Sequence, residues 1–227
     1  MTVKRSKQGG FNLSELSERI PPWLLILAIL AIVTLIVTVK TLSREPLQPK
    51  QEQTQEADGV ITVSTQNPEE SPPEGPYIVA SDEPRSIRLP AANVDGYIQK
   101  VGIDQHGKIA VPSNVTMAGW YIHSKKPGEQ GLSVIDGHVD GQTAEGIFYR
   151  LADVSAGDEL SIEYGDGSAV WFRVVDKIQV PESEAADVVF SKRQGIEHQL
   201  NLVTCGGAFD YEESTYPDRV IIVTERI

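Results

Sequence analysis

From about Arg85 to its end, the chain alternates short apolar segments with turn-forming residues, and this pattern restricts its fold most. The segments read as β-strands at 86–89, 97–101, 119–122, 132–135, Glu159–Tyr164, 169–180, 199–205 and 220–224. Gly, Pro, Asn and Asp separate them, and two short helices are expected at 147–151 and 183–191. Strands of this spacing predict one mostly-β domain over 85–227, built as a closed β-barrel or a sandwich.

The amino-terminal part contains an apolar run of a different kind. Seventeen residues from Trp23 to Val39 include no charged side chain. As a helix they span roughly 25 Å, the low end of a bilayer core. A cleaved signal peptide would have a shorter apolar core and a small-x-small site, which the sequence after Val39 lacks. A buried core helix would show a polar face. We therefore expect a retained transmembrane anchor over 20–40.

Charges around this run predict its orientation. Lys4, Arg5, Lys7 and Arg19 precede it, so residues 1–19 are expected in the cytoplasm and the remainder outside a single-pass cell membrane. Residues 41–84 are rich in Gln, Glu, Pro, Ser and Thr, a composition that predicts a flexible, largely disordered extracellular linker.

Composition also excludes some partners. The formal net charge is −12, and residues 41–227 contain thirty acids against fifteen bases. Nucleic-acid binding requires basic patches, so no nucleic-acid partner is expected. No acidic cluster has the spacing of a calcium loop and no Cys/His set has that of a zinc site, so we predict no metal and no cofactor.

The one cysteine, Cys205, ends an apolar segment and precedes Gly206 and Gly207. A lone cysteine has no internal disulfide partner, so it acts either as packing or as a thiol. At the end of a strand a ligand can reach it, and Gly206 would let another backbone approach. A buried structural cysteine is the competing interpretation.

A catalytic thiol needs two further groups. A nearby imidazolium or guanidinium lowers its pKa, and attack on an amide carbonyl creates an oxyanion that needs fixed donors or positive charge. His138 follows a predicted strand between glycines and has the most constrained surroundings of the four histidines, while Arg219 enters an apolar strand, where an arginine needs a partner. Cys205, His138 and Arg219 are therefore the candidate catalytic residues.

Several motifs in matching order resemble the sortases, most closely those of class F. They are Ser86–Pro90, Val111-Pro112, Gly119–Tyr121, Gly137–Asp140, Phe148–Leu151 and the LVTCGGAFD stretch at 202–210. The resemblance covers about residue 85 to the end. It implies an eight-stranded sortase-type β-barrel and cysteine transpeptidase activity. Cys205 then matches the nucleophile, His138 the general acid/base, and Arg219 the group that stabilises the oxyanion.

The resemblance also implies partners. Sortases cleave a carboxy-terminal LPxTG-like sorting signal between Thr and Gly and hold the acyl part as a thioester on cysteine. An amine, commonly that of a peptidoglycan precursor, then resolves the thioester. A hydrolase with the sortase fold, or a non-catalytic module that binds sorting signals, remains the alternative. An L,D-transpeptidase would show a Ser-His-Gly-Cys arrangement, which the chain lacks.

One position departs from class F, whose members often place the arginine where this chain has Pro217. Period-two alternation gives positions 217 and 219 the same facing, and other sortase classes match Arg219 better. Two neighbours are supporting candidates. Asp140 could orient His138 or stabilise a turn, and the Thr204 hydroxyl could support the site or simply suit a strand.

Overall fold

The computed structural model describes residues 56–57, 59–62, 64 and 67–227. The expected cytoplasmic segment 1–19 and the expected anchor 20–40 lie outside these residues. Within the described part, no helix is both long and apolar enough to cross a membrane.

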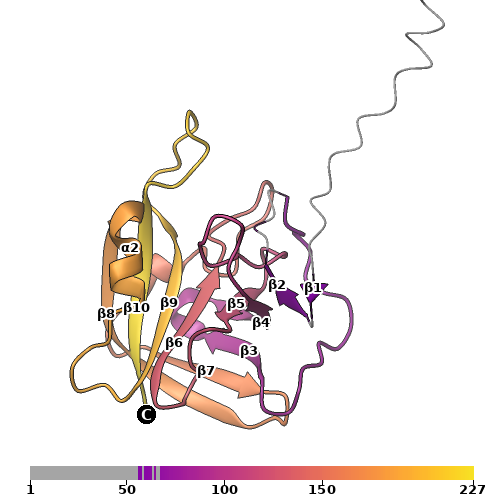
Figure 1. The fold of residues 1–227 in the computed structure, drawn as a ribbon, viewed down its shortest axis with the longest axis vertical. Coiled ribbons are helices and arrows are strands. Elements are labelled where there is room, and N and C mark those ends of the chain that lie inside the picture. Colours follow the sequence, from indigo (N-terminus) through magenta and orange to yellow (C-terminus); the bar gives the residue numbers. More distant parts are fainter. Residues whose placement is uncertain (1–55, 58, 63, 65–66) are drawn as a thin grey trace, which may run out of the picture. The chain divides into compact units, whose positions relative to one another are not determined.

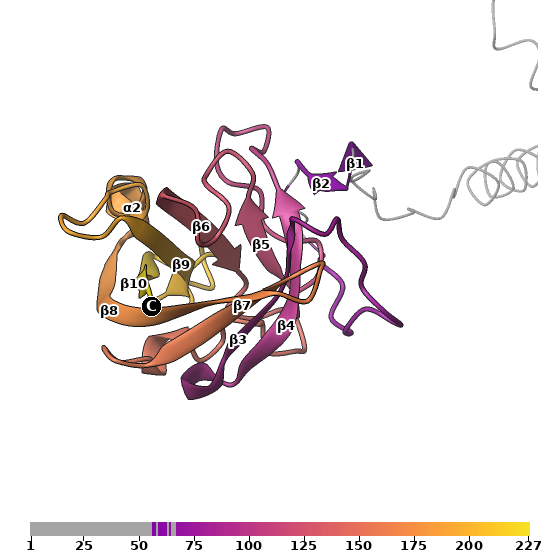
Figure 2. The ribbon, with the colours of Figure 1, turned by 90° about the horizontal axis from the view of Figure 1, so that it is seen from below.

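Eight strands form a closed barrel. They are β3 (Pro84–Leu89), β4 (Val94–Val101), β5 (Ala118–Tyr121), β6 (Gly131–Gly137), β7 (Glu159–Tyr164), β8 (Ala169–Pro181), β9 (His198–Gly206) and β10 (Asp218–Arg226). They pair in the order β4-β3-β7-β8-β10-β9-β6-β5 (Figure 1). β5 pairs in turn with β4, which closes the barrel (Figure 2). This confirms the mostly-β, eight-stranded barrel and decides against the sandwich.

Period-two alternation divides the strand residues into two clusters. Residues pointing inward form the barrel core, among them Ile87, Ile98, Leu160, Phe172, Leu200, Leu202 and Ile222. Residues pointing outward from β6, β9 and β10 form a second buried cluster with Val189 of helix α2 (Glu182–Val189): Leu132, Val134, Val203, Ile221 and Val223. We call this outer side of β6, β9 and β10 the α2 face.

The helix expected at 147–151 does not form. Residues 147–150 form turns, followed by the 3-10 helix η3 (Leu151–Asp153). The backbone N–H of Leu151 donates to the carbonyl of Phe148, an i→i+3 bond that closes a turn tighter than an α-helix. Phe148 and Leu151 are fully buried in the barrel core, so their packing decides the local backbone. A second 3-10 helix, η2 (Pro90–Ala92), joins β3 to β4.

Within residues 41–84, where a flexible linker is expected, the described residues include two short strands. Strand β1 (Glu56–Ala57) pairs with β2 (Val60–Ile61), and β2 pairs with β4 in parallel. Ile61 is only 1% exposed and packs with Val101 and Ala110. The residues around Ile61 are mostly polar, so composition gave no indication of this packing. A strand that pairs only with a strand far away in the sequence cannot be recognised from local composition.

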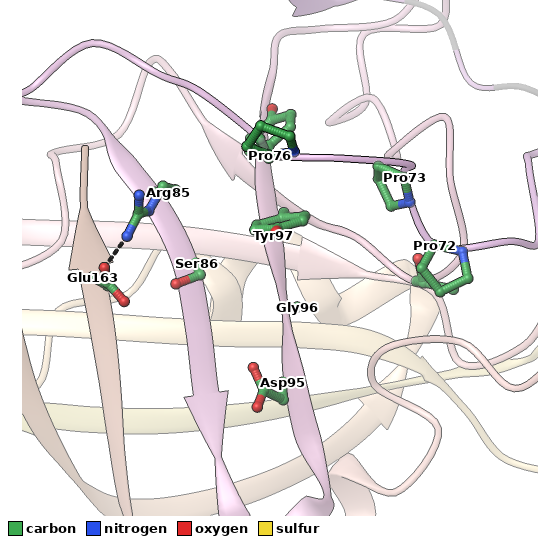
Figure 3. A pocket seen from close by; sticks show the side chains of 11 residues that line it. Pro72, Pro73, Pro76, Arg85, Ser86, Asp95, Gly96, Tyr97 and Glu163 are labelled. Atoms are coloured by element: carbon green, nitrogen blue, oxygen red, sulfur yellow. Dashed lines mark hydrogen bonds and ion pairs between the residues drawn. The ribbon is translucent and has the colours of Figure 1, made fainter. Parts of the chain in front are cut away.

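Further along, residues 72–77 cross the outer side of β3 and β4. The rings of Tyr77 and Tyr97 stack with centroids 5.0 Å apart. Between this segment and the barrel lies a cavity of about 500 Å³. It is lined by Pro72, Pro73, Pro76, Tyr77, Arg85, Ser86, Asp95, Gly96, Tyr97, Thr116 and Glu163, and the ion pair of Arg85 with Glu163 stands at one side (Figure 3). None of the candidate catalytic residues lines this cavity.

Candidate active site

Two strand pairings bring the candidate residues together. In the antiparallel β9–β10 pair, Cys205 stands directly opposite Arg219. In the parallel β6–β9 pair, Asp136 is beside Val203, and His138 follows two residues later, immediately after the end of β6. The Thr204 hydroxyl donates to the Gly137 carbonyl at 2.7 Å and fixes this alignment. Adjacent strands are about 4.8 Å apart, so these residues converge at one end of three neighbouring strands.

Alternation sets the direction of the side chains. Cys205 shares the facing of Val203, and Arg219 shares that of Ile221, so both belong to the α2 face rather than the barrel core. Asp136 follows Val134 with the same facing. Thr204 has the opposite facing and is buried, which explains why it supports the strands and does not join the thiol.

The surroundings of the thiol keep it protonated at neutral pH. Desolvation raises the pKa of Cys205 to about 11, and the Arg219 guanidinium opposes this increase. The carboxylates of Asp136, Glu182 and Asp140 raise the same pKa further by repelling a thiolate. A reaction at this sulfur therefore needs a base that accepts its proton.

His138 is oriented by a backbone carbonyl. Its Nε2 lies 2.8 Å from the carbonyl oxygen of Pro112. A carbonyl only accepts hydrogen bonds, so Nε2 carries the hydrogen and Nδ1 is the basic nitrogen of the neutral ring. The carboxylate of Asp140 accepts the hydroxyl hydrogen of Tyr216. Pro112 is the partner that sequence reasoning missed.

Arg219 is held in one direction by three groups. Its Nη1 donates to the carbonyls of Tyr216 at 3.0 Å and Asp218 at 2.8 Å. Its Nη2 lies 3.1 Å from Glu182 Oε1 at the start of α2. Lys108 Nζ reaches the same oxygen at 2.7 Å, and its hydrogen bond is the main cause that lowers the pKa of Glu182. The Arg219 side chain is only 20% exposed.

The two glycines after Cys205 have distinct tasks. A Cβ on Gly206 would lie 2.8 Å from Val220 Cγ2 and 3.5 Å from Val220 N, so a larger residue here would require Val220 to shift. Gly207 has φ +84°, which starts the loop 207–217 between β9 and β10. In that loop Phe209 makes edge contacts with Tyr211 and Tyr216.

Asp136 is a residue that the sequence analysis did not single out. Its Oδ1 accepts the Gly137 N–H at 2.5 Å. Burial raises the pKa of its carboxyl to about 6, while the positive charges of His138 and Arg219 act in the opposite direction. A signal was available: an aspartate at an outward position of an apolar strand, two residues before His138, is unusual on burial grounds.

The described residues contain no group of three or more His, Cys, Asp or Glu placed to hold a metal ion.

A closed β-barrel whose end assembles a thiol, an imidazole and a guanidinium defines the class of β-barrel cysteine enzymes. Comparison with protein families makes this more specific: the Sortase domain model matches residues 87–227, and the chain belongs to the sortase family.

Solved sortase structures are similar in fold. A lid mutant of sortase A from Corynebacterium diphtheriae is 21% identical, with a TM-score of 0.49 over 68% of this chain and 72% of that one. Sortase C-1 from Actinomyces oris is 22% identical, with a TM-score of 0.47 over 64% and 75%. Sortase A from Listeria monocytogenes is 19% identical, with a TM-score of 0.46 over 63% and 86%. No curated protein sequence matches the chain.

Proposed function

We propose that the protein is a membrane-anchored sortase, most similar to class F, that acts as a cysteine transpeptidase on LPxTG-like sorting signals. The observation that supports this is the register that pairs Cys205 with Arg219 and brings the end of β6, which His138 follows, next to β9, in a chain of the sortase family. Cys205 is the nucleophile, His138 the general acid/base and Arg219 the oxyanion-stabilising group.

The first half-reaction forms an acyl-enzyme. His138 takes the thiol proton through Nδ1, and the sulfur attacks the carbonyl carbon of the Thr–Gly bond. Arg219 stabilises the negative charge that develops on the carbonyl oxygen. The C–N bond then breaks, His138 gives its proton to the leaving amine, and a thioester remains on Cys205.

The second half-reaction regenerates the thiol. An amine, such as that of a peptidoglycan precursor, gives a proton to His138 and attacks the thioester carbonyl. The C–S bond breaks, a new amide forms, and the proton returns to sulfur. One amide is exchanged for another, so no cofactor or oxidant is required.

The location of the enzyme is part of the proposal. The charge-free run from Trp23 to Val39 supports a single-pass anchor in the cell membrane, with residues 1–19 in the cytoplasm and the barrel outside. Membrane fractionation of the full chain, followed by protease treatment of intact cells, tests it. Degradation of the barrel only after lysis would contradict the proposed orientation.

The chemistry is tested with an LPxTG peptide and a primary amine. The wild-type protein should form a thioester visible by mass spectrometry and release an amide product with the amine. Cys205→Ala should do neither while keeping its fold by circular dichroism. Free acid as the main product despite the amine would identify a hydrolase, and binding without cleavage would identify a recognition module.

A further inference from the structure

The chain segment before the barrel makes directed contacts near His138. We name residues 67–77 the N-terminal strap. The Glu69 N–H donates to the Ser113 carbonyl and the Val115 N–H donates to the Glu69 carbonyl, both at 2.8 Å. The side chain of Asn114, which is buried, donates to the Ser71 carbonyl at 2.7 Å. The strap is thus paired with residues 113–115, directly after Pro112.

Glu70 connects the strap to a second segment. Its carboxylate accepts the backbone N–H groups of Gln142 and Thr143, the latter at 3.1 Å and 3.2 Å from its two oxygens. The Thr143 hydroxyl donates to Glu70 Oε2, and this hydrogen bond is the main cause that lowers the Glu70 pKa. The amide of Gln142 donates to Asn67 at 2.6 Å.

Gly141 makes this contact possible. A Cβ on Gly141 would overlap the carboxylate of Glu70. The loop therefore presents a bare backbone to the strap, and one carboxylate takes two consecutive backbone donors. Such a charge-assisted arrangement fixes direction as well as distance.

The two segments that the strap contacts both adjoin His138, one through the Pro112 carbonyl and the other through the chain itself. The carbonyl of Pro112 accepts the ring hydrogen at Nε2, and the loop 139–146 begins at the next residue after His138. We propose that Glu70 is a positioning residue of the active site, which fixes the loop after His138 relative to Pro112 and so aims the ring at the thiol. This inference rests on the proposed function of His138.

A misplaced acid/base group lowers the rate of proton transfer more than it lowers peptide affinity. In the full-length protein, Glu70→Ala should lower kcat about 10-fold and change KM less than about twofold. Glu70→Gln keeps one acceptor oxygen and should give an intermediate kcat. Thr143→Val removes a single hydrogen bond to Glu70 and should lower kcat by a smaller factor.

Glu74→Ala is the matched control, because Glu74 belongs to the strap, is exposed and has no hydrogen bond or ion pair within the described residues. Its kcat and KM should equal those of the wild type. A Glu70→Ala protein with wild-type kcat would overturn the proposal, as would a change confined to KM. If Glu70→Ala does not fold, an unchanged kcat in Thr143→Val together with Glu70→Gln would overturn it. A wild-type protein that forms no Cys205 thioester would instead reject the proposed function, before any variant is compared.

Discussion

Cys205 and Arg219 are directly opposed residues of the antiparallel strands β9 and β10, and both side chains belong to the α2 face. Their proximity is therefore a property of strand register and not of a flexible loop. The guanidinium is fixed at the same time by Glu182 and by two backbone carbonyls. A positive charge held in this way can act on the thiol and on an oxyanion that forms next to it.

Removing this charge should affect both the thiol and catalysis. In Arg219→Ala the pKa of Cys205 should rise beyond its value of about 11, because the guanidinium that lowers it is lost. Iodoacetamide alkylation at fixed pH should slow, and kcat/KM should fall by about 10²–10³. Arg226→Ala, on the same strand but at its far end, is the control and should behave as wild type. Unchanged alkylation in Arg219→Ala would refute the electrostatic role.

Asp136→Asn should shift the pKa of the Cys205 thiol in the opposite direction, toward lower values. The Asp136 carboxylate raises the pKa of Cys205, so its neutral replacement lowers that pKa. The pH dependence of alkylation should shift toward acid, measured as the midpoint of rate against pH. Asp95→Asn, an exposed change on β4, should leave the midpoint in place. A midpoint that stays constant in Asp136→Asn would show that this carboxylate does not act on the sulfur.

The same carboxyl makes a prediction about stability. Its pKa is about 6 in the folded protein against an ordinary 3.8, so between these values the folded state binds more protons than the unfolded state. The contribution of Asp136 to the free energy of unfolding therefore falls as pH rises from about 4 to about 6 and stays low above it. As pH rises across this window, the free energy of unfolding of Asp136→Asn should increase relative to that of the wild type, by at most about 3 kcal/mol. Urea unfolding at several pH values measures the difference, and a constant difference would contradict the prediction.

The hydrogen bond from Tyr216 to Asp140 connects the loop 207–217 to the loop after His138. Tyr216→Phe removes only the hydroxyl group, so the ring should keep its contact with Phe209. We expect kcat/KM to fall by about 3–10-fold, since a hydrogen bond to a partly exposed carboxylate is worth about 1 kcal/mol. Tyr211→Phe is the matched control, because Tyr211 is 88% exposed. Equal activity of the two variants would show that the connection does not matter.

Phe148 closes the barrel core beside the loop that follows His138. It is fully buried, and a Cβ on Gly137 would meet its ring at 2.5 Å. Phe148→Ala should lower the free energy of unfolding by about 3–5 kcal/mol, the sum of lost burial and a residual cavity. Tyr149→Ala, at the neighbouring half-exposed residue, should cost under about 1 kcal/mol. Chemical denaturation of both variants compares them directly, and similar losses would contradict the assigned packing.

The strands could be predicted from the sequence because the pattern of apolar residues that marks each strand lies within the strand itself. The alternation around Phe172 recurs in β8 and the apolar segment around Leu202 recurs in β9, both at nearly the expected bounds. The residues 147–151 could not be assigned in the same way. The large apolar side chains of Phe148 and Leu151 are compatible with a helix. In the structure they pack into the barrel core from a turn and the start of a 3-10 helix.

At the candidate site, too, some residues could be predicted from the sequence and others could not. The residue types of Cys205, His138 and Arg219 suggested thiol chemistry because each supplies a group that the reaction needs. Asp136 and Pro112 were missed. The pKa of Asp136 depends on its burial in the fold, and Pro112 contacts His138 through its backbone carbonyl, so the identity of neither side chain reveals these roles. Glu70 was missed because a polar composition conceals the few contacts that attach the strap.

By itself, the sequence determined the number and spacing of the barrel strands and the chemical groups available, because apolar patterning and residue type are local properties. The tertiary structure decided which strands became neighbours, and therefore that Cys205 opposes Arg219 and that Pro112 orients His138. It also decided that Glu70 contacts the loop after His138. These relationships join residues far apart in the chain, and only the closed barrel, with one register for each strand pair, specifies them.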